Sequence, residues 1–324
     1  MNEVHPRPMR RSVATNLVSA VNNERIVFTA ADRVPKRKSK KRLKPPGVFL
    51  NDTDRQIVEL IIAFDFLSRF QIADYIGLSA VTVHRRCHKL AALKILDDRC
   101  RGLSGEVLYV PTRSAMRLVG MADGFRIGNP TAQTIAHTSA CFQTALRFAE
   151  NIGRHGICIS ENEIQAAASS GHLSPRILRQ AAWAEQQFQG RYAGWLPVAA
   201  AANGGGKTGH KRPDLVLIKQ NLAPVAVEVE LTLKAKIADY VRVLEAYDKA
   251  IVKKDFSSVI YVTAEVCGNS GVDGAISKAL STALAQANLL HKMVVTYLVY
   301  ELSIEKWAAR SYLNGWYRKA SRAA

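Results

Sequence analysis

The chain has 324 residues, of which 48% are hydrophobic, and its formal net charge is +18. No apolar run reaches the roughly 18 residues that a membrane-spanning helix needs, and the basic N-terminus lacks the apolar core of a signal peptide. The sequence therefore argues against a membrane partner and predicts a cytoplasmic protein. The five cysteines are an odd number without CxxC spacing, which predicts reduced thiols and neither a disulfide framework nor a zinc site. The charge favours a polyanionic partner.

The first 50 residues form a predicted disordered basic arm. They contain twelve Lys or Arg and three Asp or Glu, which is half of the net charge. The densest run has no apolar period and lies between Pro35 and Pro46, so we expect no folded core there. The arm is either a linker or, as we prefer, a segment that neutralises DNA phosphates. Its candidate DNA-binding residues are Lys36, Arg37, Lys38, Lys40, Lys41 and Arg42.

The pattern of residues 51–125 predicts a winged helix-turn-helix. Apolar residues at helical spacing, with Asp52 or Thr53 as the cap, predict a first helix that reaches Phe64. A second helix is expected over 70–76, where Gly77 would end it in a left-handed conformation. Ser79 would cap a third helix, whose inward stripe is Val83, Cys87 and Leu90.

Two short predicted strands, 95–97 and 106–110, follow the third helix and flank a basic, glycine-containing turn, as the wing of such a domain would. Arg and Lys side chains on the third helix can reach base edges and phosphates in the major groove. A solvated helical domain or a protein-interaction module is the alternative. The candidate DNA-binding residues are Thr82, Arg85, Arg86 and Lys89 of the helix and Arg99 and Arg101 of the turn.

Residues 126–310 predict an α/β domain with a mixed sheet flanked by helices, and a basic tail would follow at 311–324. The expected order is helix, strand, strand, strand, helix, strand, helix, strand. The helices are predicted at 131–153, 234–253 and 274–290, and the strands at 157–161, 214–218, 225–231, 258–263 and 293–302. His137 lies on the first helix and receives no chemical role, because a lone helical histidine is more often structural.

Three carboxylates belong to the two central strands. If these strands pair as a hairpin with its turn near Asn221, then Asp214, Glu228 and Glu230 face one side of the sheet. Carboxylates gathered among Val, Leu and Ile repel one another unless a cation lies between them, which predicts a divalent-metal site. The alternative is a half-exposed strand with solvated acids.

These segments resemble the PD-(D/E)XK nuclease superfamily and, more narrowly, the replication-relaxation family of plasmids and other bacterial mobile elements. The resemblance rests on Arg212-Pro213-Asp214, on Glu228-Val229-Glu230 and on the Ser160-Glu161 stretch. It implies Mg²⁺-dependent phosphodiester hydrolysis. Asp214 and Glu228 would hold Mg²⁺, and Glu161 would be an extra ligand. Glu230 replaces the usual lysine of the motif, so Lys234 or Lys236 would supply the missing positive charge, and Arg212 would contact phosphate.

Three functions remain open at this point. The first is a mobile-element protein that binds double-stranded DNA and acts as an endonuclease or nickase in replication, relaxation or mobilisation. The second is a non-catalytic regulator or accessory factor with a degenerate nuclease fold. The third is a module that recruits replication or transfer proteins. A homodimer is compatible with each of them.

Overall fold

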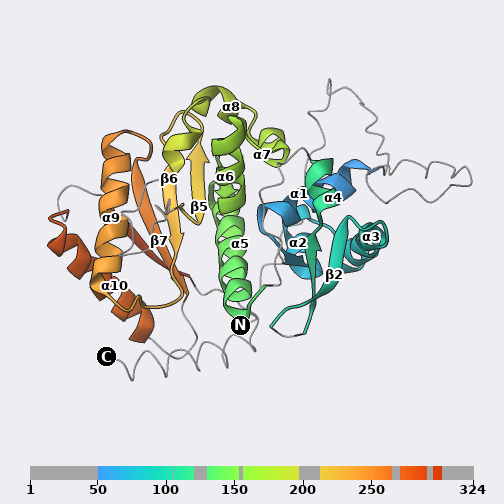
Figure 1. The fold of residues 1–324 in the computed structure, drawn as a ribbon, viewed down its shortest axis with the longest axis horizontal. Coiled ribbons are helices and arrows are strands. Elements are labelled where there is room, and N and C mark those ends of the chain that lie inside the picture. Colours follow the sequence, from blue (N-terminus) through green and yellow to red (C-terminus); the bar gives the residue numbers. More distant parts are fainter. Residues whose placement is uncertain are drawn as a thin grey trace, which may run out of the picture. The chain divides into compact units, whose positions relative to one another are not determined.

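The computed structural model describes residues 50–103, 105–119, 130–152, 156–196, 212–264, 271–289 and 295–300. The predicted arm, the predicted boundary at 125 and the predicted tail lie outside the described residues, apart from Leu50. The compact unit that begins at Asn51 is mixed α/β and contains two sheets (Figure 1).

Residues 51–119 form what we call the helix–hairpin segment. Its three-stranded antiparallel sheet has the order β1-β3-β2, and β2 and β3 form the hairpin. The helices are α1 (Asp52–Ala63), α2 (Arg69–Ile76), α3 (Ala80–Ala92) and α4 (Arg113–Leu118), and the strands are β1 (Leu67–Ser68), β2 (Leu96–Arg101) and β3 (Val107–Pro111).

Local capping explains where these helices begin and end. The predicted cap of α1 is wrong: the side chain of Asn51 accepts the hydrogen bond from the amide of Asp54 at 2.8 Å, so the cap lies one residue before Asp52. The predicted caps at Gly77, with φ of 76°, and at Ser79 are confirmed. The inward stripe predicted for α3 is also confirmed, because its three residues are fully buried.

The second sheet has five strands in the order β4-β5-β6-β7-β8, and only its first two pairings are antiparallel. The predicted hairpin is confirmed: Leu215 pairs with Val227, and Asn221 has a φ of 63° in the turn. The strands are β4 (Gly156–Ser160), β5 (Leu215–Lys219), β6 (Val225–Val229), β7 (Ser258–Ala264) and β8 (Val295–Tyr300).

Three helices of this part follow the predicted positions, and a helical stretch between β4 and β5 was not predicted. The predicted helices are α5 (Ala132–Ile152), α9 (Ile237–Val252) and α10 (Gly271–Gln286). The stretch comprises α6 (Glu161–Ser170), α7 (Pro175–Gln180), α8 (Trp183–Phe188) and the 3₁₀ helix η2 (Tyr192–Trp195). The aromatic residues Phe188, Tyr192 and Trp195 of this stretch are buried in the main core, and this packing holds the stretch in place.

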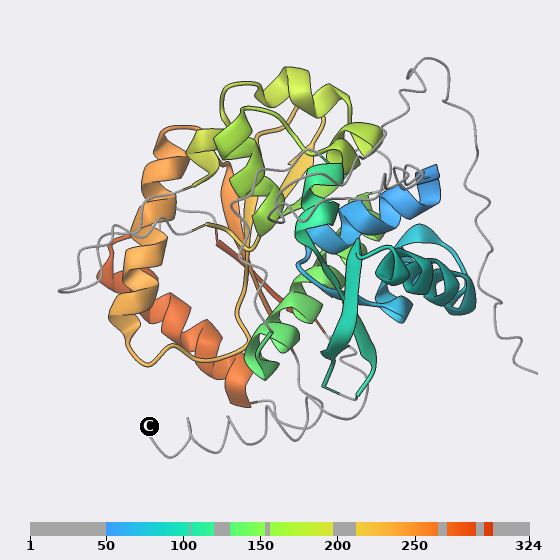
Figure 2. The same cartoon turned by 45° about the vertical axis from the view of Figure 1, so that its right-hand side comes forward.

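The two faces of the five-stranded sheet have different neighbours. Side chains of Ile159, Val216 and Ala226 face a core that is completed by α6 to α10. Among the described residues, α5 contributes nothing to this core but contacts β4, β5 and β6, so it packs on the other face. Figures 1 and 2 show α5 and α9 on different sides of the strands.

The helix–hairpin segment packs directly against α5, α6 and α7. The ring of Phe64 meets that of Phe142 edge-on with centroids 5.2 Å apart. Asn162 donates to the carbonyl oxygen of Ile62 at 3.1 Å, and Arg179 forms an ion pair with Glu59. None of the described helices is long and apolar enough to cross a membrane.

Candidate functional site

The polar residues singled out in the sequence gather at one edge of the five-stranded sheet. Strands β4 and β6 end there and β5 begins there, because β5 is antiparallel to both neighbours. This topology brings together Glu161, which follows β4, Asp214, which precedes β5, and Glu228 and Glu230 at the end of β6.

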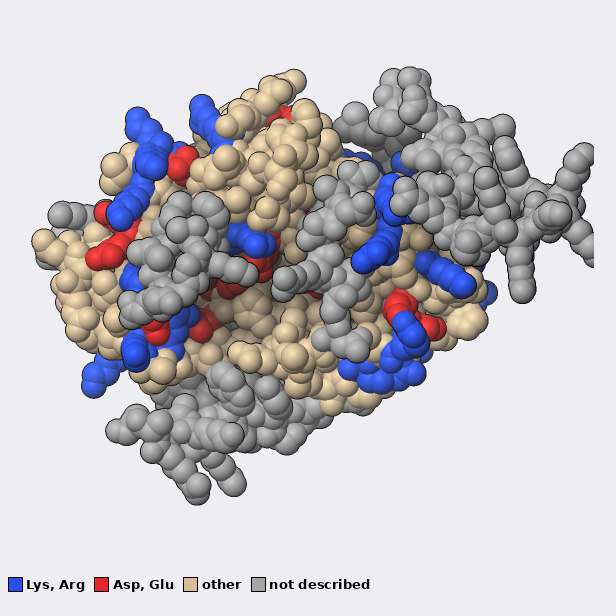
Figure 3. All heavy atoms as spheres, in the orientation of Figure 1, with Lys and Arg blue, Asp and Glu red and all other residues tan. Residues whose placement is uncertain are grey.

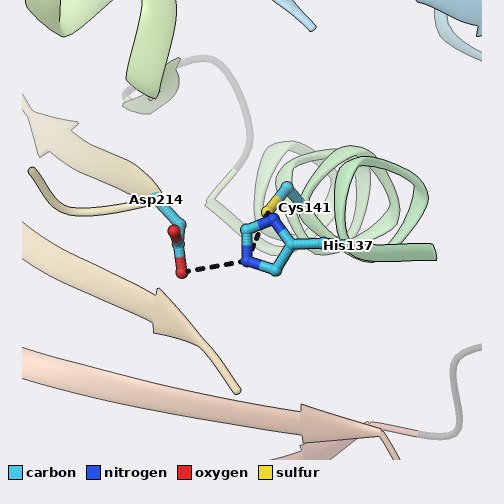
Figure 4. A group of neighbouring side chains, drawn as sticks. All are labelled: His137, Cys141 and Asp214. Atoms are coloured by element: carbon cyan, nitrogen blue, oxygen red, sulfur yellow. Dashed lines mark hydrogen bonds and ion pairs between the residues drawn. The ribbon is translucent and has the colours of Figure 1, made fainter. Parts of the chain in front are cut away.

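Asp214 lies against helix α5. Its Oδ2 accepts a hydrogen bond from the amide of Val229 at 2.7 Å, which fixes the carboxylate at the end of the hairpin. The same oxygen lies 3.5 Å from Nε2 of His137, and the Asp214 side chain is 16% exposed (Figure 4). The contact joins the beginning of β5 to α5.

His137 and Cys141 are one helical turn apart on α5 and face each other. The Sγ of Cys141 lies 3.7 Å from Nδ1 of His137 and 3.9 Å from Nε2. Together with a carboxylate oxygen of Asp214, one donor atom from each residue lies within 4.8 Å of the others. Among the described residues, no other group of three His, Cys, Asp or Glu side chains meets this distance.

This environment shifts the pKa values of both α5 residues. The pKa of His137 is raised above its usual value by the charge of Cys141 and by the hydrogen bond and charge of Asp214, against the effect of burial. Burial raises the pKa of the Cys141 thiol, although His137 acts in the opposite direction.

Glu228 points to α9. Its carboxylate is 4% exposed and accepts a hydrogen bond from the hydroxyl of Tyr247. Burial and the charge of Glu228 raise the pKa of Tyr247 well above its ordinary value. The buried hydroxyl of Tyr261 lies nearby without a hydrogen-bond partner among the described residues, and its pKa is raised by burial and by the charges of Glu228, Glu230 and Asp214.

The remaining site residues form ion pairs at the same edge. Lys234 pairs with Glu230, four residues earlier in the segment between β6 and α9, and lies 5.0 Å above the ring of Tyr240. Arg212 pairs with Glu161 at 3.3 Å. Burial and the charge of Asp214 raise the pKa of Glu161 despite the Arg212 guanidinium.

The predicted convergence of Asp214, Glu228 and Glu230 is not the arrangement in the structure. Residue 214 precedes the first residue of β5, so the alternation of side chains along the strand does not govern it, and its carboxylate turns to the Val229 amide and to α5. Glu228 accepts a hydrogen bond from Tyr247, and Glu230 forms an ion pair with Lys234. No three described carboxylates bring their oxygens within 4.8 Å of one another.

This arrangement does not fit the predicted magnesium site. Mg²⁺ prefers an octahedral shell of oxygen ligands, whereas the one tight group among the described residues, His137, Cys141 and Asp214, offers nitrogen, sulfur and oxygen. The ligand set of Asp214, Glu228, Glu230 and Glu161 remains a prediction from the resemblance, and we derive no chemical step through Mg²⁺.

Helix α3 presents only part of its predicted DNA-binding set to solvent. Arg85 and Lys89 are exposed one turn apart, and Thr82 is half-buried, its hydroxyl accepting from Ser79 at 2.9 Å. Arg86 differs from the prediction, because its guanidinium pairs with the buried carboxylate of Asp54 at 2.8 Å. That contact fastens α3 to α1 and occupies a side chain that the sequence assigned to DNA.

The two hairpin arginines also differ from expectation. Arg99 and Arg101 lie in β2, before the turn in which the sequence placed them. Arg99 forms an ion pair with Asp97, and Arg101 donates to the carbonyl oxygen of Asp98 at 2.7 Å, yet both side chains are exposed. On the face shown in Figure 3, Lys and Arg side chains are spread over several elements and do not form one continuous patch.

Sequence reasoning missed His137 and Cys141 as members of the site. Their spacing of four residues puts both on one face of a helix, which was a usable signal. Their meeting with Asp214, which lies 73 positions after Cys141, depends on how α5 packs on the sheet and had no sequence signal.

Comparisons of the chain with protein-family models, with curated proteins and with solved structures find no match.

Proposed function

We propose that this protein binds double-stranded DNA and that residues 51–119 act as a winged helix-turn-helix. The proposal includes the role implied by the resemblance, a replication, relaxation or mobilisation protein of a bacterial mobile element. The observation that carries it is the pair of exposed cations on α3, Arg85 and Lys89, beside an antiparallel hairpin with exposed Arg99 and Arg101. The net charge of +18 adds a favourable field for a polyanion.

The faces of α3 have different roles in this proposal. Val83, Cys87 and Leu90 fix one face of the helix in the core, and Arg86 holds it to α1. Arg85 and Lys89 are then left to enter the major groove, where Arg and Lys bind guanine edges and phosphates. The hairpin arginines would follow the adjacent backbone.

The first prediction concerns this surface. The double variant Arg85→Ala/Lys89→Ala should bind a labelled DNA duplex about tenfold or more weakly than the wild type, since a lost base or phosphate contact weakens binding by about 1–3 kcal/mol. The slope of log affinity against log salt should fall by roughly 2, about one for each lost phosphate contact. Fluorescence anisotropy over a salt series measures both.

The matched control is Lys249→Ala/Lys253→Ala, which removes the same charge from exposed positions at the end of α9. Equal losses of DNA affinity in the two double variants would mean that only the overall charge matters, and would contradict the assignment of α3 as the DNA-binding helix. A wild type without affinity for duplex at moderate salt would favour the protein-recruiting module.

DNA cleavage is the second candidate function. It is favoured by the position of four acidic residues, Glu161, Asp214, Glu228 and Glu230, at a single edge of the sheet. The substrate would be the phosphodiester backbone of the DNA held by the helix–hairpin segment.

The second prediction tests cleavage. If the edge is catalytic, supercoiled plasmid should be nicked in the presence of a divalent metal, and Asp214→Asn should abolish nicking while DNA affinity is unchanged. The assay should compare Mg²⁺, Mn²⁺, Co²⁺ and Zn²⁺, and gel electrophoresis measures the open-circular product. DNA binding without nicking under every metal would instead support the non-catalytic regulator.

A further inference from the structure

We propose that His137, Cys141 and Asp214 form a binding site for a borderline divalent transition metal, Zn²⁺ or Co²⁺, with at least one coordination position left open. The inference concerns the folded protein alone and does not depend on DNA binding or cleavage. It also departs from the sequence prediction, which found no zinc site because it considered only paired cysteines.

The distances between the donor atoms suit such an ion. Bond lengths of about 2.0 Å for Zn–N and about 2.3 Å for Zn–S at tetrahedral angles place the nitrogen and sulfur roughly 3.5 Å apart. In the structure, Sγ of Cys141 lies 3.7 and 3.9 Å from the two ring nitrogens of His137. Nε2 of His137 lies 3.5 Å from Oδ2 of Asp214, and a metal–oxygen bond of about 2.0–2.2 Å gives a similar separation. The nitrogen–sulfur and nitrogen–oxygen separations are therefore close to those that a tetrahedral ion requires.

The donor types decide the class of metal. A thiolate and an imidazole favour Zn²⁺ and its neighbours in the first transition row, whereas Mg²⁺ and Ca²⁺ need oxygen ligands. Three protein ligands of mixed type with a further position for water are also the usual composition of a catalytic zinc site, while structural sites commonly have four.

The surroundings hold the three ligands in place. Val229 donates its backbone amide to Asp214, an outer-shell hydrogen bond of the kind that orients metal ligands. His137 and Cys141 are fixed by one turn of α5, and Cys141 is buried whereas the His137 side chain is 37% exposed. Entry is therefore from the His137 side, and a bound ion would join α5 to the beginning of β5.

The third prediction tests this site with Co²⁺ as the probe. Chelator-stripped, reduced full-length protein should bind one equivalent of Co²⁺ and develop a thiolate-to-cobalt charge-transfer band with tetrahedral d–d bands. Zn²⁺ should displace the cobalt stoichiometrically, and excess Mg²⁺ should not. Cys141→Ser should lose the charge-transfer band, and His137→Gln and Asp214→Asn should each weaken Co²⁺ binding by at least about tenfold.

The matched control is Cys100→Ser, which removes the half-buried thiol of β2 and should leave the spectrum unchanged. A wild type without the charge-transfer band, or a band that persists in Cys141→Ser, would overturn the proposal. Circular dichroism checks the fold of each variant. If Cys141→Ser does not fold, the partly exposed His137→Gln decides: unchanged Co²⁺ affinity in that variant would equally overturn the site.

Discussion

Replacing Arg176 by alanine should destabilise the protein by about 3–5 kcal/mol, the cost of leaving a buried charge without its partner. Arg176 is 4% exposed and Glu163 is 1% exposed. The guanidinium donates through Nε to Oε1 of Glu163 at 2.8 Å and through Nη2 to the carbonyl oxygen of Cys158 at 2.9 Å. Its Nη1 donates to the hydroxyl of Tyr75, so one side chain joins α2, β4 and α6.

The pH dependence of this loss follows from Glu163. Burial opposes ionisation of Glu163, but the charge of Arg176 and hydrogen bonds from Arg176, Ser174 and the Ser160 amide outweigh it and lower the pKa. A depressed folded-state pKa contributes stability that is present above the ordinary value of 4.5 and is lost as the pH falls through the folded-state pKa. The difference between wild type and Arg176→Ala should therefore be large at neutral pH and shrink in acid.

Urea unfolding followed by circular dichroism, at neutral pH and below 4.5, measures both effects. Arg242→Ala is the matched control, because Arg242 pairs with Asp239 on the surface of α9 and its loss should cost at most about 1 kcal/mol. Similar small losses in both variants would show that the Glu163–Arg176 pair is not buried in solution.

Phe142→Ala should destabilise the protein by about 3–5 kcal/mol through the cavity that it leaves. Phe142 belongs to α5, is 1% exposed, and its ring lies 5.2 Å from that of Phe64 and 6.0 Å from that of Tyr75. The substitution removes packing between the helix–hairpin segment and the five-stranded part. We therefore expect a lower midpoint for unfolding of both parts, not for one of them.

Phe70→Ala provides the control, since Phe70 on α2 is 42% exposed and its truncation should change stability by less than about 0.5 kcal/mol. Thermal unfolding followed by tryptophan fluorescence reports the five-stranded part through Trp183 and Trp195. Far-ultraviolet circular dichroism reports both parts together, so a dichroism transition of Phe142→Ala in which one part still unfolds at the wild-type midpoint would contradict the shared packing.

The elements that the sequence predicts well are those fixed by nearby residues. Gly77 and Ser79 end and begin their helices through contacts within a few positions, and the β5–β6 hairpin follows from two apolar runs around a turn at Asn221. The helical stretch from α6 to η2 was missed because its helices are short, and buried aromatic residues such as Trp195 order it through tertiary contacts.

The sequence predicts where the candidate site lies on the sheet, but not which side chains contact its carboxylates. Strand order places Asp214 and Glu228 at one edge of the sheet, and the alternation of side chains suggested a common target for them. Which helix each carboxylate faces depends on packing: α5 supplies His137 to Asp214, and α9 supplies Tyr247 to Glu228. Arg86 illustrates the same limit, because its partner Asp54 lies 32 positions earlier on another helix.

The contacts of α1 and α2 with the rest of the molecule determine how the proposed DNA binding can be tested. A shortened polypeptide that stops after α4 would expose the ring of Phe64, leave the carboxylate of Glu59 without Arg179, and deprive the Ile62 carbonyl of Asn162. Such a fragment would expose an apolar surface and a carboxylate without its cationic partner, and we expect it to aggregate. The proposed DNA binding is therefore better tested with point substitutions in the intact polypeptide than with an excised domain.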